Sequence, residues 1–197
     1  SGSMLVVIVG ATSLAARTDA PTLAAHQLVA ATLSFLALAL DALAIPAQTL
    51  VADALGRDDR DAAWTIDRKV VRLSVWVAGV LGVIVAALSA VLPRLFSADP
   101  AVIDRAFAGY LVLGLAVLLP AGIAFAIDGS LIGAGDYRFL GWAAFGYLAL
   151  AVPIGAVILL TDAGIVAIWV GMALWMIARA VINDRRVRSV LDPSAFT

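Results

Sequence analysis

The sequence LAAHQLVAATLSFLALALDALAIPAQTLVADAL, residues 23–55, decides how the rest of the chain is interpreted. Alanine and leucine dominate it, and both are strong helix formers. At about 1.5 Å per residue, a helix of this length would be roughly 50 Å long, which exceeds the ~30 Å hydrocarbon core of a bilayer. We therefore expect a membrane-spanning helix here.

A polar stripe follows one side of this predicted helix. Its members recur every seven residues, close to two helical turns, so they share one face with a drift of only ~20° per step. They are Gln27, Ser34, Asp41 and Gln48. Asp41 places a carboxylate near the middle of the span, at a cost of roughly 2.5–3.5 kcal/mol, which makes it a candidate functional residue. The alternative is that the stripe makes only interhelical hydrogen bonds, worth under ~1 kcal/mol each.

The composition indicates an all-α integral membrane protein. Of the 197 residues, 63% are hydrophobic and 14% charged, and the mean hydropathy is +1.06. A soluble domain is nearer one half apolar and one quarter charged. The apolar residues form runs long enough for helices, and the ten-residue alternation typical of a membrane barrel is missing.

The same composition narrows the function classes. A net charge of −1 argues against a nucleic-acid partner, and the lack of cysteine excludes disulfides and thiolate ligands. His26 is the only histidine, which excludes a multi-histidine metal site; a hydrogen-bonded helix residue is favoured for it over a proton relay. The zincin, nucleophile-elbow and P-loop signatures are all missing, so we expect no enzyme, no metal and no cofactor.

The pattern predicts six transmembrane helices. Their approximate ranges are residues 4–16, 23–55, 65–92, 101–133, 139–160 and 164–184. The first is too short to cross a bilayer, and we expect it to be the end of a longer helix whose start is absent or replaced by residues 1–3.

Smaller expectations concern helix ends and packing. Gly56 is expected to cap the second helix, and Ser97 or Asp99 to cap the fourth. Gly79 and Gly82 are expected to let a neighbouring helix approach closely.

A second carboxylate lies in the fourth predicted helix. Gly114, Ala121 and Asp128 fall on one heptad line, which forms a small-residue groove leading to Asp128. Two carboxylates on different spans of one bundle, Asp41 and Asp128, favour a cation or proton site. A membrane aspartate that alternates between aqueous and apolar surroundings takes up and releases a proton, because burial raises its pKa. The alternative for Asp128, as for Asp41, is that its carboxylate makes only interhelical hydrogen bonds.

Basic residues are distributed unequally between the two ends of the predicted spans, and the positive-inside rule then makes both termini cytoplasmic. The side on which the first helix starts carries ten: Arg57, Arg60, Arg68, Lys69, Arg72, Arg138, Arg179, Arg185, Arg186 and Arg188. The other side carries three: Arg17, Arg94 and Arg105.

Three motifs resemble the MATE (multidrug and toxic compound extrusion) family, in particular the bacterial subgroup resembling DNA-damage-inducible protein F. They are AAHQ at 24–27, LALDALAIPAQTLVADALGRDD at 38–59 and FAIDGSLIGAGD at 125–136. The resemblance implies twelve helices in two six-helix lobes around a central cavity. It also implies export of cationic or amphipathic compounds by proton or sodium antiport across the inner (plasma) membrane.

On this resemblance, residues 1–197 correspond to the C-terminal lobe, and the N-terminal lobe is absent. The matching motifs carry over Gln27, Asp41, Gln48 and Asp128 as cavity-lining or ion-coupling residues. The departure is that the membrane aspartate on the subgroup's first helix has no counterpart here. The expected partners are the bilayer, amphipathic or cationic substrates, and either the missing lobe or a second copy.

Two other functions stay open. One is a lipid-linked carrier or flippase of the wider superfamily, and the other is a fragment that does not transport. The scarcity of arginine and lysine within the spans favours the exporter, because a flippase of anionic lipids is expected to show buried cations.

Overall fold

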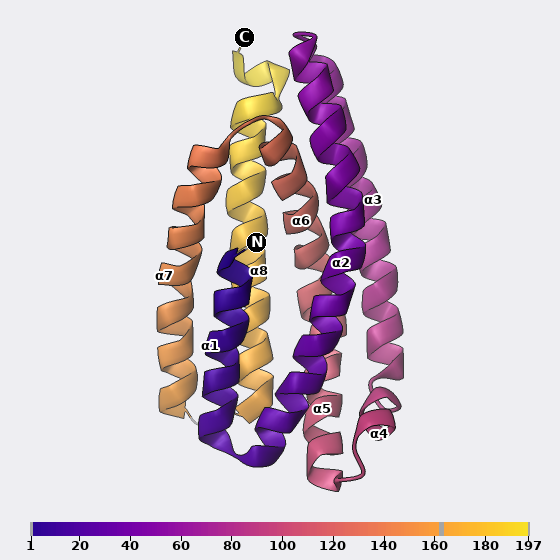
Figure 1. The fold of residues 1–197 in the computed structure, drawn as a ribbon, viewed down its shortest axis with the longest axis vertical. Helices are drawn as coiled ribbons and strands as arrows, with labels where there is room; N and C mark the ends of the chain where they lie inside the picture. Colours follow the sequence, from indigo (N-terminus) through magenta and orange to yellow (C-terminus); the bar gives the residue numbers. More distant parts are fainter. Residues whose placement is uncertain (1, 162–163, 197) are drawn as a thin grey trace.

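The computed structural model describes residues 2–161 and 164–196, and it is helical throughout these ranges apart from short turns (Figure 1). The elements, in chain order, are α1 (Gly2–Thr18), α2 (Ala20–Gly56), α3 (Arg60–Leu88), α4 (Leu92–Phe96), α5 (Pro100–Val112), the π-helix η1 (Leu113–Val117), α6 (Leu118–Gly133), α7 (Tyr137–Thr161), α8 (Gly164–Leu191) and the 3-10 helix η2 (Pro193–Phe196). The predicted all-helical class is therefore confirmed.

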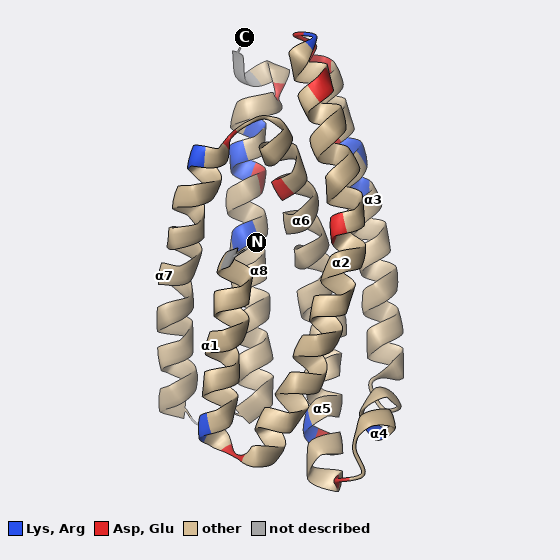
Figure 2. Ribbon diagram, viewed as in Figure 1, with Lys and Arg blue, Asp and Glu red and all other residues tan. Residues whose placement is uncertain are grey.

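Five helical segments within the described residues are long and apolar enough to cross a bilayer. They are α2, α3, the continuous run Pro100–Gly133, α7 and α8. A sixth, shorter apolar helix covers Ser3–Thr18. Charged residues are sparse along the middle of the bundle and gather at the end where α2 meets α3 and the chain terminates (Figure 2).

The run through α5, η1 and α6 forms the centre of the bundle. α6 packs against α2, α3 and α8, while α1 lies between α2 and α7. α7 is the most peripheral of the five long segments, since Tyr147 is the one buried residue among those described in it. The central position of α6 places Asp128 among several helices.

Aspartates begin three of the long helices. The carboxylates of Asp19, Asp59 and Asp99 accept hydrogen bonds from the backbone N–H groups of Thr22, Ala62 and Ala101. Each bond satisfies one of the donors that a helix start leaves free. Asp99 is thus the cap at the fourth predicted helix. The expected glycine cap of α2 is wrong: Gly56 is its last helical residue, and Asp58 takes the left-handed conformation with φ 59°.

Three predicted helix boundaries differ from the structure by four residues or more, and the first is the start of the third helix, which lies at Arg60 and not at residue 65. The third helix ends at Leu88, and the short α4 follows where the helix was expected to continue to residue 92. The last helix continues to Leu191, well past the expected end at residue 184. Ion pairs hold this extension, because Arg188 bonds Asp184 one turn earlier at 2.6 Å.

The long helix expected at 101–133 contains a π turn at residues 113–117. Pro120 follows it, and a proline neither donates to the carbonyl four residues earlier nor tolerates that carbonyl close to its ring. A wider turn just before Pro120 accommodates both restrictions while the helix continues.

Glycines bring the central run close to its neighbours. A Cβ added at Gly114 would lie 2.5 Å from the carbonyl oxygen of Gly82, so α3 and η1 meet backbone to backbone. The expectation that a neighbouring helix approaches closely is confirmed for Gly82. It is wrong for Gly79, where an added Cβ would meet nothing within 4 Å. Gly129 and Gly133 of α6 face the backbone of α2 in the same way.

Candidate functional site

A buried polar cluster surrounds Asp128 between α6, α7 and α8. Oδ1 of Asp128 accepts a hydrogen bond from Nδ2 of Asn183 at 2.6 Å, and Oδ2 forms an ion pair with the guanidinium of Arg179. The Arg179 side chain is 2% exposed and that of Asp128 16% exposed. Both carboxylate oxygens therefore have a donor, and the two charges neutralise each other away from water.

Tyr147 connects α7 to the same cluster. Its hydroxyl donates to Oδ1 of Asn183, and Nε1 of Trp175 donates to the Tyr147 carbonyl at 2.8 Å. The Arg179 guanidinium also lies over the ring of Phe125, at 5.6 Å from its centroid. Hydrogen bonds, an ion pair and a cation–π contact thus hold α6, α7 and α8 together around Asp128.

Asp41, the other predicted carboxylate, is only half-buried on α2. Its side chain forms no hydrogen bond or ion pair with the described residues. It lies close enough to Asp128 for the two carboxylates to repel each other, but it does not join the cluster. The structure therefore provides two carboxylates in different states: Asp128 is paired, and Asp41 has no hydrogen-bond or ion-pair partner among the described residues.

The two predicted glutamines do not reach this cluster. Gln27 and Gln48 are exposed on α2, as is Ser34. With the half-buried Asp41, these residues form a polar stripe on the side of α2 that its neighbours leave uncovered. A polar stripe of this kind is poorly suited to contact with lipid tails.

Sequence reasoning missed Arg179, Asn183, Tyr147 and Trp175 as members of the site. Placing Arg179 among the interfacial cations is wrong, because it is buried and paired within the bundle. One available signal was the spacing of Arg179 and Asn183, which are four residues apart and so share one helix face.

His26 is buried beside Thr12 and Trp169. Its Nε2 lies 3.2 Å from the Thr12 hydroxyl, and its ring centroid lies 5.6 Å from that of Trp169. This arrangement matches the hydrogen-bonded helix residue that the sequence favoured. The described residues contain no group of three or more histidine, cysteine, aspartate or glutamate side chains that would bind a metal ion.

A second ionic cluster joins α3 to α8 near the charged end of the bundle. Arg68 bonds Asp67 at 2.7 Å and Asp184 at 3.0 Å, and its guanidinium lies 4.3 Å from the ring centroid of Trp64. Arg186 bonds Asp136 at 2.5 Å and so ties α8 to the turn between α6 and α7. These pairs fix the helix ends next to the Asp128 cluster.

Comparison with known proteins places the chain in a family. The family model described as MatE matches residues 3–157. The chain belongs to the MATE transporter family. It is therefore a multi-pass membrane protein of a transporter family and not an enzyme.

The relatives are considerably longer than this chain. It is 28% identical to Protein DETOXIFICATION 45, chloroplastic, of Arabidopsis thaliana, over 94% of this chain and 33% of the relative. It is also 28% identical to Protein DETOXIFICATION 44, chloroplastic, over 97% of this chain and 36% of that relative. The chain thus spans about a third of the length of the curated relatives it matches.

A solved structure has the same fold. It is a MOP superfamily transporter from Pyrococcus furiosus, described as having a binding pocket of reverse polarity. The match has a TM-score of 0.80 at 18% sequence identity and covers 100% of this chain and 42% of that one. The helix arrangement is accordingly that of part of a MOP transporter.

Proposed function

We propose that this chain is the C-terminal six-helix lobe of a MATE secondary transporter, of the subgroup resembling DNA-damage-inducible protein F. The assembled transporter exports organic cations or amphipathic compounds in exchange for protons or sodium ions. It lies in the inner (plasma) membrane with both termini cytoplasmic. Arg179 is buried and does not count toward the positive-inside rule. Nine basic residues then remain on the side where the first helix starts and three on the other side, which still supports this orientation.

The observation that carries the proposal is the uncovered polar stripe of α2. A spanning helix that presents Gln27, Asp41 and Gln48 outward is suited to a polar cavity rather than to lipid. Transporters of this kind place their sites near the midplane between two repeats. A second six-helix lobe, or a second copy of this chain, would complete such a cavity.

The two carboxylates have different roles in this proposal. Asp41 is half-buried and has no ion-pair partner in the part of the chain that the structure describes, so it is the group that exchanges a proton or sodium ion and meets the cationic substrate. Asp128 has its charge neutralised by Arg179, so it sets the shape and field of the cavity wall. Gln27 and Gln48 line the cavity and bind polar groups of the substrate.

A carrier or flippase of anionic or lipid-linked substrates is the second candidate. The buried cation Arg179 favours it. Against it, Arg179 is already neutralised by Asp128, so an anion gains little net attraction unless that pair opens.

Transport into proteoliposomes tests the proposal. We expect a proton gradient to drive uptake of a fluorescent organic cation when this chain is reconstituted with a co-expressed six-helix N-terminal lobe. Uptake by this chain alone would assign the second half to another copy. Uptake of an anionic dye, with none of the cation, would favour the second candidate and contradict the first.

Asp41→Asn is expected to abolish coupled uptake in the assembled transporter while leaving membrane insertion intact, because an amide neither carries a proton nor attracts a cation. The matched control is Asp53→Asn on the same helix, an exposed carboxylate paired with Arg57, which should transport like the parent. Initial rates against an imposed pH gradient are the measurement. An unchanged rate in Asp41→Asn would remove Asp41 from the mechanism.

A further inference from the structure

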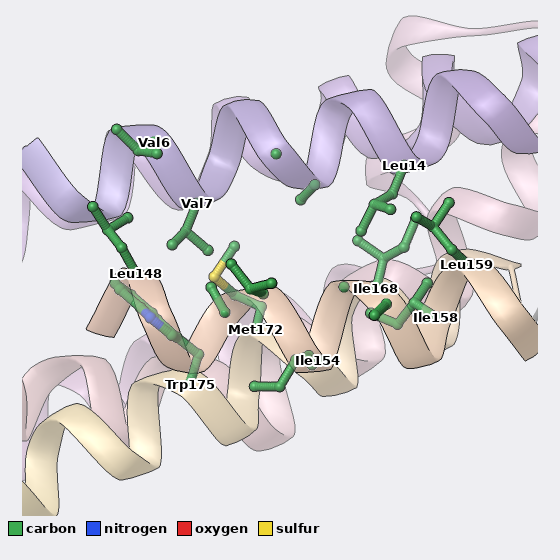
Figure 3. Close-up of a pocket in the computed structure, with 17 residues that line it drawn as sticks. Val6, Val7, Leu14, Leu148, Ile154, Ile158, Leu159, Ile168, Met172 and Trp175 are labelled. Atoms are coloured by element: carbon green, nitrogen blue, oxygen red, sulfur yellow. The ribbon is translucent and has the colours of Figure 1, made fainter. Parts of the chain in front are cut away.

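A continuous apolar groove runs between α1, α7 and α8 (Figure 3). Its volume is about 490 Å³. Val6 and Leu14 of α1 face Leu148 and Leu159 of α7 across it, and Trp175 of α8 closes one end. Small residues widen it: a Cβ added at Gly10 would meet nothing within 4 Å.

The length and position of the groove match one leaflet of a bilayer. From Leu148 to Leu159, α7 advances about 16 Å at its rise per residue. Half of the ~30 Å hydrocarbon core is ~15 Å. The end next to Leu159 lies where α1 stops at Thr18 and α7 at Thr161. The groove therefore begins at a helix-end level and reaches toward the middle of the membrane.

A cation lies at that end. Arg17 follows Leu14 by three residues, which places both on one face of α1. Arg17 is exposed and forms no ion pair with the described residues. The nearby carboxylate of Asp19 is already engaged with Arg105 at 2.7 Å. Hydrogen bonds from Thr22 hold the pKa of Asp19 below its usual range, so this pair is ionised at neutral pH.

We propose that this groove binds one acyl chain of a phospholipid whose phosphate lies against Arg17. The apolar lining matches the chain, the length matches one leaflet, and the arginine complements the phosphate. The bound lipid fills the space that α7 leaves by packing loosely on α1 and α8. It acts as a structural component of the lobe and is distinct from any transported compound.

Native mass spectrometry of the chain released from detergent tests this site. The probes are dioleoylphosphatidylcholine and dioleoylglycerol, which share acyl chains and differ in the phosphate headgroup. We expect the parent chain to retain the phospholipid in preference to the glyceride. Gly10→Leu, which fills the groove, should lower retention of both lipids roughly tenfold.

Arg17→Gln should remove the preference for phospholipid while leaving glyceride retention unchanged. Gly146→Leu is the control. Like Gly10, Gly146 is exposed and an added Cβ would meet nothing within 4 Å, but Gly146 does not line the groove. Gly155→Leu repeats the test from α7, since a Cβ there makes only an ordinary 3.8 Å contact with Leu14.

The proposal is overturned if Gly10→Leu and Gly155→Leu, shown folded by their helical melting curves, retain lipid like the parent. It is also overturned if these variants disperse a dimer instead of releasing lipid, which would identify the occupant as a second copy. A phospholipid preference that survives Arg17→Gln would contradict the assigned headgroup position.

Discussion

Replacing Arg179 with leucine is expected to destabilise the folded bundle by about 3–5 kcal/mol, because the change leaves the Asp128 carboxylate buried without its counter-ion. The Asn183 amide would still donate to Asp128, but one neutral donor does not balance a full charge at this depth. The leucine also forfeits the contact over Phe125. The free energy of unfolding in mixed micelles, followed by circular dichroism, is the measurement.

A double variant separates the lost charge from the lost packing. Asp128→Asn with Arg179→Leu removes both charges and keeps an acceptor for Asn183, so it should be distinctly more stable than Arg179→Leu alone. Arg72→Leu, an exposed cation on α3, should stay within about 0.5 kcal/mol of the parent. Asp128→Asn alone completes the comparison. If the destabilisation of the double variant equals the sum of those of the two single variants, the ion pair is not the stabilising feature.

Gly129→Ala is expected to separate α2 from α6, although it adds only one methyl group. The new Cβ would overlap the carbonyl oxygen of Ala44 and lie 3.0 Å from its carbonyl carbon. A flexible side chain would yield, but backbone on a packed helix does not. We expect the free energy of unfolding to fall by about 1–3 kcal/mol, the usual cost of overpacking.

This change should also affect transport, since Gly129 adjoins Asp128 and Ala44 lies one turn after Asp41. Widening the contact would move the two carboxylates apart, and Gly129→Leu should abolish assembly of the lobe. Gly79→Ala is the matched control, because its Cβ meets nothing within 4 Å. Equal melting temperatures for Gly129→Ala and Gly79→Ala would show that the close approach has no energetic weight.

The helices were predictable because the bilayer imposes long apolar segments, whatever their neighbours are. The long α2 and the importance of Asp128 follow from such local patterns. The π turn before Pro120 was not predicted, because the sequence shows where a proline lies but not how the helix around it accommodates the proline. The helical end of α8 was also missed, because charged residues there indicate a loop until their partners are known.

The arrangement of the site was less predictable than its carboxylates. An arginine near a helix end resembles an interfacial anchor, and only the packing of α8 on α6 reveals that Arg179 is the partner of Asp128. The stripe on α2 was predictable from its spacing of seven. That this stripe lies apart from the Asp128 cluster was not predictable, because the packing of all neighbouring helices decides which side of α2 is covered.

The attachment of α7 has a mechanical consequence. Tyr147 is the one buried residue described in this helix, and both its hydrogen bonds end on side chains of α8. If the chain is pulled from a membrane by its C-terminus, extracting α8 removes Asn183 and Trp175 together. α7 then keeps apolar contacts with α1 but has lost both of these hydrogen bonds, so the two helices should leave as one hairpin, in a single rupture event.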